Sequence, residues 1–140
     1  MAGRSTQSLY DKVGALTGMF SNTVYVRVGR NQFRVKHIES GADTTAVAST
    51  PFTTARLLIG QFVAAEETLK VALKQLSAGR LFASSPSVVM HPLEMVEGGL
   101  SEIEDRTLRE VAIGAGAGKA VVWVGRELSD SEVKEKLSGK

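Results

Sequence analysis

Apolar and polar residues alternate in two short stretches near the amino end of the chain, residues 23–28 and 33–38. An apolar residue at every second position is typical of a strand that buries one of its faces. Residues 29–32 and 39–43 have the composition of turns, and residues 44–50 form a third short run that favours β structure. Three consecutive strands joined by short turns predict an antiparallel meander.

A helical period replaces the alternation after this meander. We expect the helical region to open at residues 51–54 and to end at Gly79, since glycine commonly follows the last turn of a helix. Charged residues lie largely on the side opposite to the apolar ones. The apolar stripe that defines this helix consists of Phe62, Ala65, Leu69, Ala72, Leu73 and Leu76.

The second half of the chain predicts a strand, a loop, a helix and another strand. The apolar run 88–90 is ended by Pro92, and the run 120–124 is apolar and β-branched, as in a strand buried on both faces. Ser101 precedes Glu104 by three residues, the spacing of a capping box that opens a helix. Two strands separated by a helix require a crossover, so we expect them to lie parallel with the helix on one face of their sheet.

The end of this helix and the start of the last one are marked as well. Ser129 and Glu132 repeat the capping-box spacing and predict a short polar helix over residues 130–137. The order of three strands, helix, strand, helix, strand, helix predicts an α/β fold, a mixed α+β sheet of five strands. Without a repeat or a linker, we expect one domain over residues 21–140, preceded by an amphipathic segment over residues 1–20. Three glycines loosen and stop the earlier helix: Gly114, Gly116 and Gly118.

The first 20 residues contain an apolar stripe of their own, at the spacing of one helix face. Two interpretations are open. The segment packs against its own domain as a terminal helix, or it docks on a membrane or a protein partner with the help of Arg4 and Lys12. The candidate membrane or partner contacts are Leu9, Tyr10, Val13, Leu16, Met19 and Phe20.

Composition narrows the partners and the compartment. The net charge of +2 is too small to predict nucleic-acid binding, and the absence of cysteine removes disulfides and thiolate chemistry. No apolar run approaches the roughly 18 residues of a membrane span, and residues 1–20 lack the continuous apolar core of a secretory signal. We therefore expect a cytoplasmic protein, at most peripheral to a membrane, that binds no nucleic acid.

Residues 103–110, IEDRTLRE, followed by GAGA at residues 114–117, resemble a known family. In the bacterial actin homologue MreB, the rod shape-determining protein, a strand ending in proline precedes a helix containing V-E-R-R-A-I-R-E, then G-A-G-A and a strand. Residues 18–22, GMFSN, also match a stretch before the first strand of some members, in which the preceding segment is an amphipathic membrane anchor. The resemblance implies the ribonuclease H-like half of the actin, Hsp70 and sugar-kinase superfamily, over nearly the whole chain.

The same resemblance implies that the family's nucleotide chemistry is dismantled. Its phosphate loop, D-x-G-T, falls on residues 27–30, where Arg27 replaces the acid that holds hydrated Mg²⁺ and Arg30 replaces a small hydroxyl residue. Two arginines are compatible with a weak anion site or with solvated side chains at a strand end. A second family acid falls on Gln61. Glu104 matches the glutamate that positions the hydrolytic water, and it fits the capping box equally well.

Other chemical signals are weak. His37 and His91 lie in different predicted elements without a second ligand type nearby, so no metal site is predicted. The glycines before Lys119 match neither a P-loop nor a dinucleotide fingerprint. The chain ends where the first half of the MreB family ends, so we expect the second phosphate loop and the adenosine pocket to be missing. We predict no catalytic residue, no cofactor and no metal.

These observations favour a non-catalytic, actin-like scaffold or binding module linked to bacterial cell shape or the cytoskeleton. Its partner would be a full-length homologue, a second copy of the chain, or the inner membrane surface. The alternative is a residual nucleotide-binding ATPase half-domain, completed by oligomerisation or a second chain, in which Glu104 acts on the water. A decayed remnant without a selected role is a third interpretation.

Overall fold

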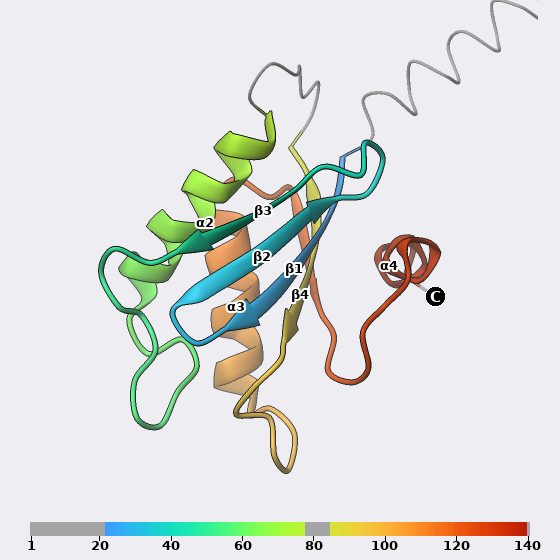
Figure 1. Cartoon of the computed structure of the whole chain (residues 1–140). Helices are drawn as coiled ribbons and strands as arrows, with labels where there is room; N and C mark the ends of the chain where they lie inside the picture. The colour runs from blue at the N-terminus through green and yellow to red at the C-terminus, as the bar shows by residue number, and fades with distance from the viewer. Residues whose placement is uncertain (1–21, 78–84, 140) are drawn as a thin grey trace, which may run out of the picture.

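A five-stranded mixed sheet forms the centre of the molecule in a computed structural model, which describes residues 22–77 and 85–139 (Figure 1). The strand order is β3-β2-β1-β4-β5. The three amino-terminal strands pair antiparallel, whereas β4 pairs parallel with β1 and β5 pairs parallel with β4. The predicted meander and the predicted parallel crossover are therefore confirmed. The strands are β1 (Thr23–Gly29), β2 (Gln32–His37), β3 (Asp43–Val47), β4 (Ser87–Pro92) and β5 (Lys119–Val122).

Helices cover both faces of this sheet. The helices α2 (Phe62–Ser77) and α3 (Glu102–Gly114) pack on one face and bury the main core with the even-numbered valines of β1. The short helix α4 (Asp130–Leu137) packs on the other face, where Val133 and Leu137 contact a second, smaller core (Figure 1).

The first strand is buried on both faces, which corrects the prediction of a half-buried strand. Only 3% of the surface of Tyr25 is exposed, and the residue belongs to the smaller core together with Val89 and Leu128. The alternation of residues 23–28 predicted one apolar and one solvated face. It could not show that α4 and the loop before it return to cover the second face.

The helix α2 begins at Phe62, so the prediction that the helical region opens at residues 51–54 was wrong. Instead, Phe52 is fully buried and stacks on Phe33 with 4.9 Å between the ring centres. The loop is held by Asn31, whose side-chain oxygen accepts the backbone N–H groups of Phe52 and Thr53 at 2.8 Å each. These long-range contacts outweigh local helix preference. The predicted end at Gly79 lies outside the described residues.

The last strand, β5, lies at the edge of the sheet, which corrects the prediction of a strand buried on both faces over residues 120–124. Its residues are partly exposed because β4 is its one neighbour in the sheet that the structure describes. Both predicted capping boxes are confirmed. Ser101 and Glu104 exchange reciprocal hydrogen bonds at the start of α3, and Ser129 and Glu132 do so at the start of α4.

No helix among the described residues is long and apolar enough to cross a membrane. The six candidate membrane or partner contacts of residues 1–20 lie outside the described residues, so the interpretation of that segment stays a prediction.

Candidate functional site

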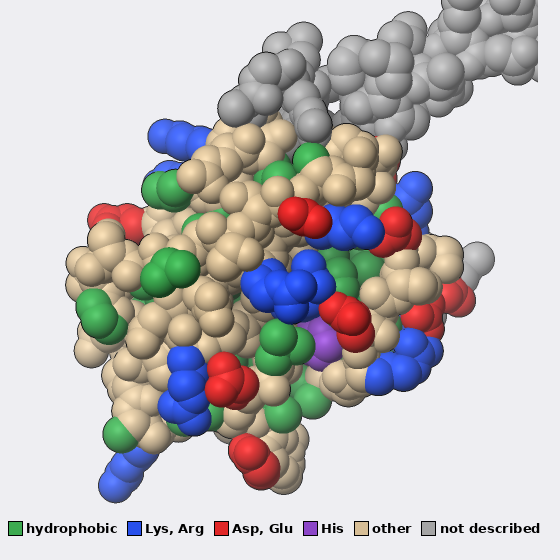
Figure 2. Space-filling view, viewed as in Figure 1, with side chains coloured by type: hydrophobic (Ala, Val, Ile, Leu, Met, Phe, Trp, Pro, Cys, Tyr) green, Lys and Arg blue, Asp and Glu red, His purple; other side chains and the backbone are tan. Residues whose placement is uncertain are grey.

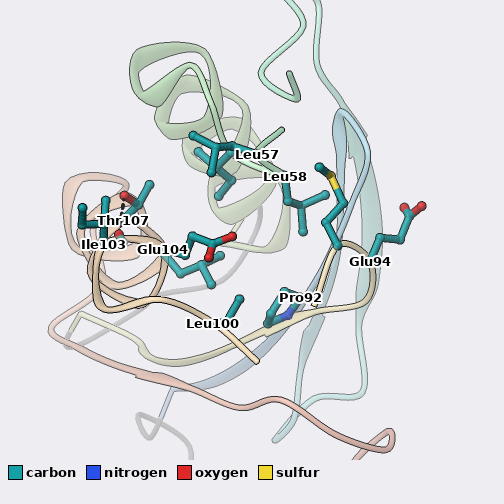
Figure 3. Close-up of a pocket in the computed structure, with 11 residues that line it drawn as sticks. Leu57, Leu58, Pro92, Glu94, Leu100, Ile103, Glu104 and Thr107 are labelled. Carbon is teal, nitrogen blue, oxygen red and sulfur yellow. Dashed lines mark hydrogen bonds between the residues drawn. The ribbon is translucent and has the colours of Figure 1, made fainter. Parts of the chain in front are cut away.

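A pocket opens at the edge of the sheet where the parallel strands β1 and β4 end (Figure 3). Ligands of open α/β sheets bind at this edge, because the loops after parallel strands meet there. The loop before α2, the loop after β4 and the first turns of α3 surround an empty volume of about 380 Å³. The lining residues are Leu57, Leu58, Ile59, Pro92, Glu94, Met95, Leu100, Ile103, Glu104, Thr107 and Leu108.

The lining of this pocket is mostly hydrocarbon. Leu58 and Leu108 form its buried floor, whereas Leu57 and Ile103 keep 39% and 76% of their surface exposed at its rim. Large apolar side chains left in water beside a concave surface favour contact with another apolar group. The pocket is therefore suited to an apolar side chain or a small apolar ligand.

Of the four positions matched to the family's chemistry, Glu104 alone lines this pocket. One of its carboxylate oxygens accepts the backbone N–H of Ser101 at 3.0 Å, so the capping role is realised. Gln61 is exposed directly before α2, and its backbone N–H donates to the carbonyl of Phe52 at 3.0 Å. Neither contact requires a nucleotide.

Arg30 lies in the turn between β1 and β2, where it is held by Glu94. Its guanidinium Nε lies 3.1 Å from one oxygen of the Glu94 carboxylate, and its backbone N–H donates to the other oxygen at 3.0 Å. The side chain is about half exposed. In Figure 3 the Glu94 carboxylate points away from the pocket. The cation predicted as a possible anion ligand is thus already neutralised by a neighbouring carboxylate.

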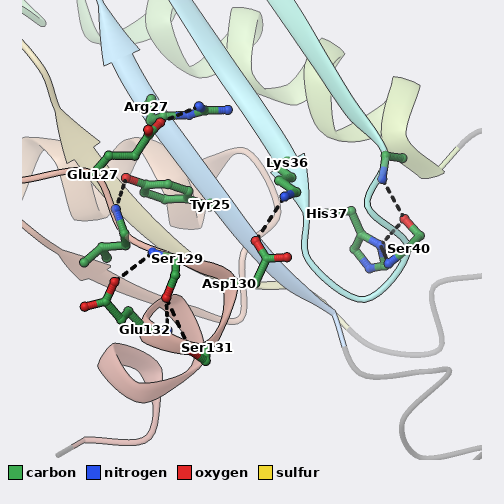
Figure 4. Close-up of polar contacts among 12 residues, drawn as sticks. Tyr25, Arg27, Lys36, His37, Ser40, Glu127, Ser129, Asp130, Ser131 and Glu132 are labelled. Carbon is green, nitrogen blue, oxygen red and sulfur yellow. Dashed lines mark hydrogen bonds and ion pairs between the residues drawn. The ribbon is translucent and has the colours of Figure 1, made fainter.

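Arg27 corrects the expectation of a solvated side chain at the strand end, because 12% of its side-chain surface is exposed. It points to the α4 face of the sheet, where its Nη1 lies 2.8 Å from Oε1 of Glu127 and its guanidinium lies over the ring of Tyr25 (Figure 4). Arg27 and Arg30 are therefore held by different carboxylates, and they do not form one anion site.

A buried polar network lies next to this ion pair, and sequence reasoning missed it. The hydroxyl of Tyr25 lies 2.6 Å from Nδ1 of His91 and accepts the backbone N–H of Leu128 at 3.1 Å. Nε2 of His91 lies 2.8 Å from the carbonyl oxygen of Gly125. A carbonyl only accepts hydrogen bonds, so Nε2 carries the proton and Nδ1 accepts from the Tyr25 hydroxyl.

Burial keeps both members of this network neutral. Loss of solvent lowers the pKa of His91 and raises the pKa of Tyr25. His91 retains 2% of its exposed surface, so it has no access to a substrate. The signal that could have found the pair is the strand register, in which His91 pairs with Arg27 and therefore faces the same side as Tyr25. The sequence of either strand alone does not determine this register.

The surface above this network combines both signs of charge. Figure 2 shows Lys and Arg side chains beside Asp and Glu side chains on this face. Two of these pairs connect the sheet to the segment that contains α4, namely Arg27 with Glu127 and Lys36 with Asp130 at 3.0 Å. The face is thus held by ion pairs between distant parts of the chain.

The chain is 38% identical over 99 residues to the uncharacterized protein YjaA of Escherichia coli (strain K12). The match covers 67% of this chain and 76% of YjaA. The chain belongs to the YjaA family. No protein-family model matches it.

The chemistry open to this YjaA relative can be stated for the described residues. Within residues 22–77 and 85–139, no three His, Cys, Asp or Glu side chains lie close enough together to hold a metal ion. The Tyr25–His91 pair is sealed, and the carboxylate of Glu104 is engaged in a helix cap. The apolar pocket is accessible, and its lining suits an apolar group.

Proposed function

We propose that the chain has the ribonuclease H-like topology of one half of an actin-like, MreB-like protein. Two observations support this proposal. The strand order β3-β2-β1-β4-β5 combines an antiparallel meander with parallel crossovers, as the MreB resemblance implies. The residues that carry the resemblance, 103–110 and 114–117, form the body of α3 and the exit toward β5.

In this proposal the chain is a non-catalytic scaffold or binding module in the cytoplasm or at the inner membrane surface, linked to cell shape or the cytoskeleton. The observation that carries it is the apolar lining of the pocket at the carboxyl edge of the parallel strands. A triphosphate with Mg²⁺ needs backbone donors, cations and carboxylates around it. In this chain leucines and Met95 line the pocket instead, and Arg30 is paired with Glu94. An apolar side chain of a protein partner matches the pocket better.

Calorimetric titration of the full chain with Mg²⁺·ATP tests the loss of nucleotide chemistry. We expect no binding heat at nucleotide concentrations up to about 1 mM, which corresponds to less than about 4 kcal/mol of binding free energy. Titration with ATP in the presence of EDTA is the control for metal-independent anion binding. Saturable binding with a micromolar Kd would overturn the proposal.

The second candidate, a residual ATPase half completed by another chain, is favoured by the position of Glu104 in the pocket. It predicts a hydrolysis rate that disappears in Glu104→Gln. Glutamine at this position still completes a capping box, so the variant is expected to fold. Equal baseline rates for parent and variant would exclude this candidate.

Co-sedimentation of the full chain with anionic vesicles tests the membrane role of residues 1–20. We expect Leu9→Glu and Leu16→Glu to abolish sedimentation, because a carboxylate on the apolar stripe opposes insertion among lipid tails. Neutral vesicles provide the control for the contribution of Arg4 and Lys12. Unchanged binding of both variants would exclude the stripe as the membrane contact.

A further inference from the structure

The outer edge of β3 is unpaired in the part of the chain that the structure describes. In an antiparallel pair, alternate residues turn both backbone groups toward the neighbouring strand. The carbonyl of Ala42 accepts from His37 at 2.8 Å, and the N–H of Ala48 donates to the carbonyl of Asn31 at 2.9 Å, so the even-numbered residues face β2. The backbone groups of the three odd-numbered residues point outward. These residues are Asp43, Thr45 and Val47.

Proteins normally blunt an exposed sheet edge with lysine, proline or a covering segment. The opposite edge of this sheet follows that rule. Lys119 begins β5, and the guanidinium of Arg109 donates to the carbonyl of Ala120 at 3.0 Å. In contrast, β3 contains no lysine, arginine or proline, and Val47 leaves 70% of its surface exposed. One edge of the sheet is protected and the opposite edge is open, which indicates that the open edge pairs with another strand.

We propose that β3 pairs antiparallel with β3 of a second copy of this chain, about a twofold axis at Thr45. The odd-numbered residues then oppose one another, Thr45 against Thr45 and Asp43 against Val47 of the second copy. Each of the three pairs exchanges two backbone hydrogen bonds. No like charges meet, and threonine opposite threonine is a favourable cross-strand pair. The two sheets become one sheet of ten strands, twice the five of each chain.

A hollow between β3 and α2 supports a second copy over an isolated peptide as the occupant. It has an empty volume of about 740 Å³, and Ala64, Glu67, Thr68, Val71 and Gln75 of α2 line it together with β3. Val71 is 51% exposed there. Because α2 packs on β2 and β3, pairing of the two strands brings α2 of both copies toward the junction and covers the exposed Val71.

The proposal names a partner for the scaffold function and rests on that function for its biological meaning. Its surface is separate from the apolar pocket, and its test needs neither nucleotide nor membrane. A chain that does not dimerise would therefore not contradict the proposal for the pocket. A chain that binds nucleotide would not contradict the proposal for the dimer.

Analytical ultracentrifugation of the full chain tests the pairing. We expect the mass to rise with concentration from 14.9 kDa toward twice that value. Thr45→Pro removes an outward-pointing N–H from each copy, and an edge strand tolerates proline there. We expect about 10- to 100-fold weaker association from the loss of these two hydrogen bonds. Thr45→Val keeps the N–H and is expected to associate like the parent.

A second variant and a second measurement keep the test decisive if Thr45→Pro folds poorly. Val47→Asp sets a carboxylate opposite Asp43 of the second copy and is expected to give a monomer, whereas Ile113→Asp, an equivalent change at an exposed position of α3, is expected to dimerise. Amide exchange at Thr45 should slow as concentration rises, while exchange at Ala46 stays slow throughout. A chain that is monomeric at all concentrations, a dimer insensitive to both β3 variants, or a protected Thr45 amide in a monomer would each overturn the proposal.

Discussion

The replacement Tyr25→Phe tests whether the buried network under α4 stabilises the fold. It removes one oxygen and keeps the aromatic ring, which retains 3% of its exposed surface. That oxygen donates to Nδ1 of His91 at 2.6 Å and accepts the N–H of Leu128 at 3.1 Å. In the variant an acceptor and a donor lose their partner together, in a place that water does not reach from the surface.

The magnitude follows from the two groups left unpaired. A buried polar group without a partner costs about 1–3 kcal/mol. Two such groups give a loss of about 2–4 kcal/mol in the free energy of unfolding, because the phenyl ring is easier to bury than the phenol and offsets part of the cost. For a chain of this length such a loss lowers Tm by roughly 10 °C.

Urea unfolding followed through Trp123 measures this loss directly. Trp123 is the chain's one tryptophan, its indole N–H donates to the carbonyl of Arg126 at 2.8 Å, and the ammonium group of Lys136 lies 4.2 Å from the ring centre. Its fluorescence therefore reports on the loop before α4 and on α4 itself. Coincidence with the transition seen by far-ultraviolet circular dichroism establishes that one cooperative step is being measured.

A double-mutant cycle with His91→Leu separates the hydrogen bond from general packing. If the pair is coupled as the 2.6 Å contact requires, the two single changes are not additive, and the coupling free energy exceeds about 1 kcal/mol. A Tyr25→Phe variant as stable as the parent, or strictly additive changes, would refute the reasoning. Either result would mean that the network is incidental to the attachment of α4.

Three further predictions concern pH, capping and the loop before α2. Burial lowers the pKa of His91 from 6.5 and raises that of Tyr25 from 10.0, so the unfolded chain takes up a proton first on acidification and loses one first at alkaline pH. The free energy of unfolding should therefore fall below pH 6.5 and above pH 10.0. Urea unfolding midpoints measured across this pH range test it, and in His91→Gln the midpoint should fall less steeply on the acid side. Ser101→Ala removes the α3 cap and should cost about 1 kcal/mol in urea unfolding, whereas a parent-like midpoint would contradict the cap. Asn31 has a φ of +56°, and its side chain holds Phe52 and Thr53. Both Asn31→Ala and Asn31→Gly lose these hydrogen bonds, but glycine adopts a positive φ without strain, so Asn31→Ala should lower Tm more. Equal Tm values for the two variants would rule out a strain contribution.

Apart from the parallel crossover, which follows from the order strand, helix, strand, the parts of the fold that were predicted correctly are those specified by near neighbours. The two-residue alternation in residues 23–28 and 33–38 carries its own period, and the meander follows from the short turns between such strands. Ser101 and Glu104 need only three residues of spacing to make their reciprocal hydrogen bonds. In each case the interacting groups are close in the chain, so the pattern contains the geometry.

The incorrect predictions depend on contacts between distant residues. Residues 51–61 contain the weak helix formers Thr53, Thr54 and Gly60, and Asn31 and Phe33 hold Phe52 in the loop from another part of the chain. The Tyr25–His91 pair spans 66 residues and needs the register of β1 against β4. The pocket requires three separate segments to meet at one edge. None of these arrangements produces a periodic pattern in the sequence.

Arg27 shows why the chemistry of one position cannot be assigned from its sequence match alone. The MreB resemblance assigns this position to the acid of a phosphate loop, yet strand alternation turns its side chain to the α4 face, where Glu127 neutralises it. An aspartate placed there alone would face Glu127, and the ion pair between β1 and the segment before α4 would be lost. The ion pair that attaches the segment before α4 to β1 therefore occupies the position at which an acid would be needed. An acid at this position would therefore remove one of the two ion pairs that join the sheet to the segment containing α4.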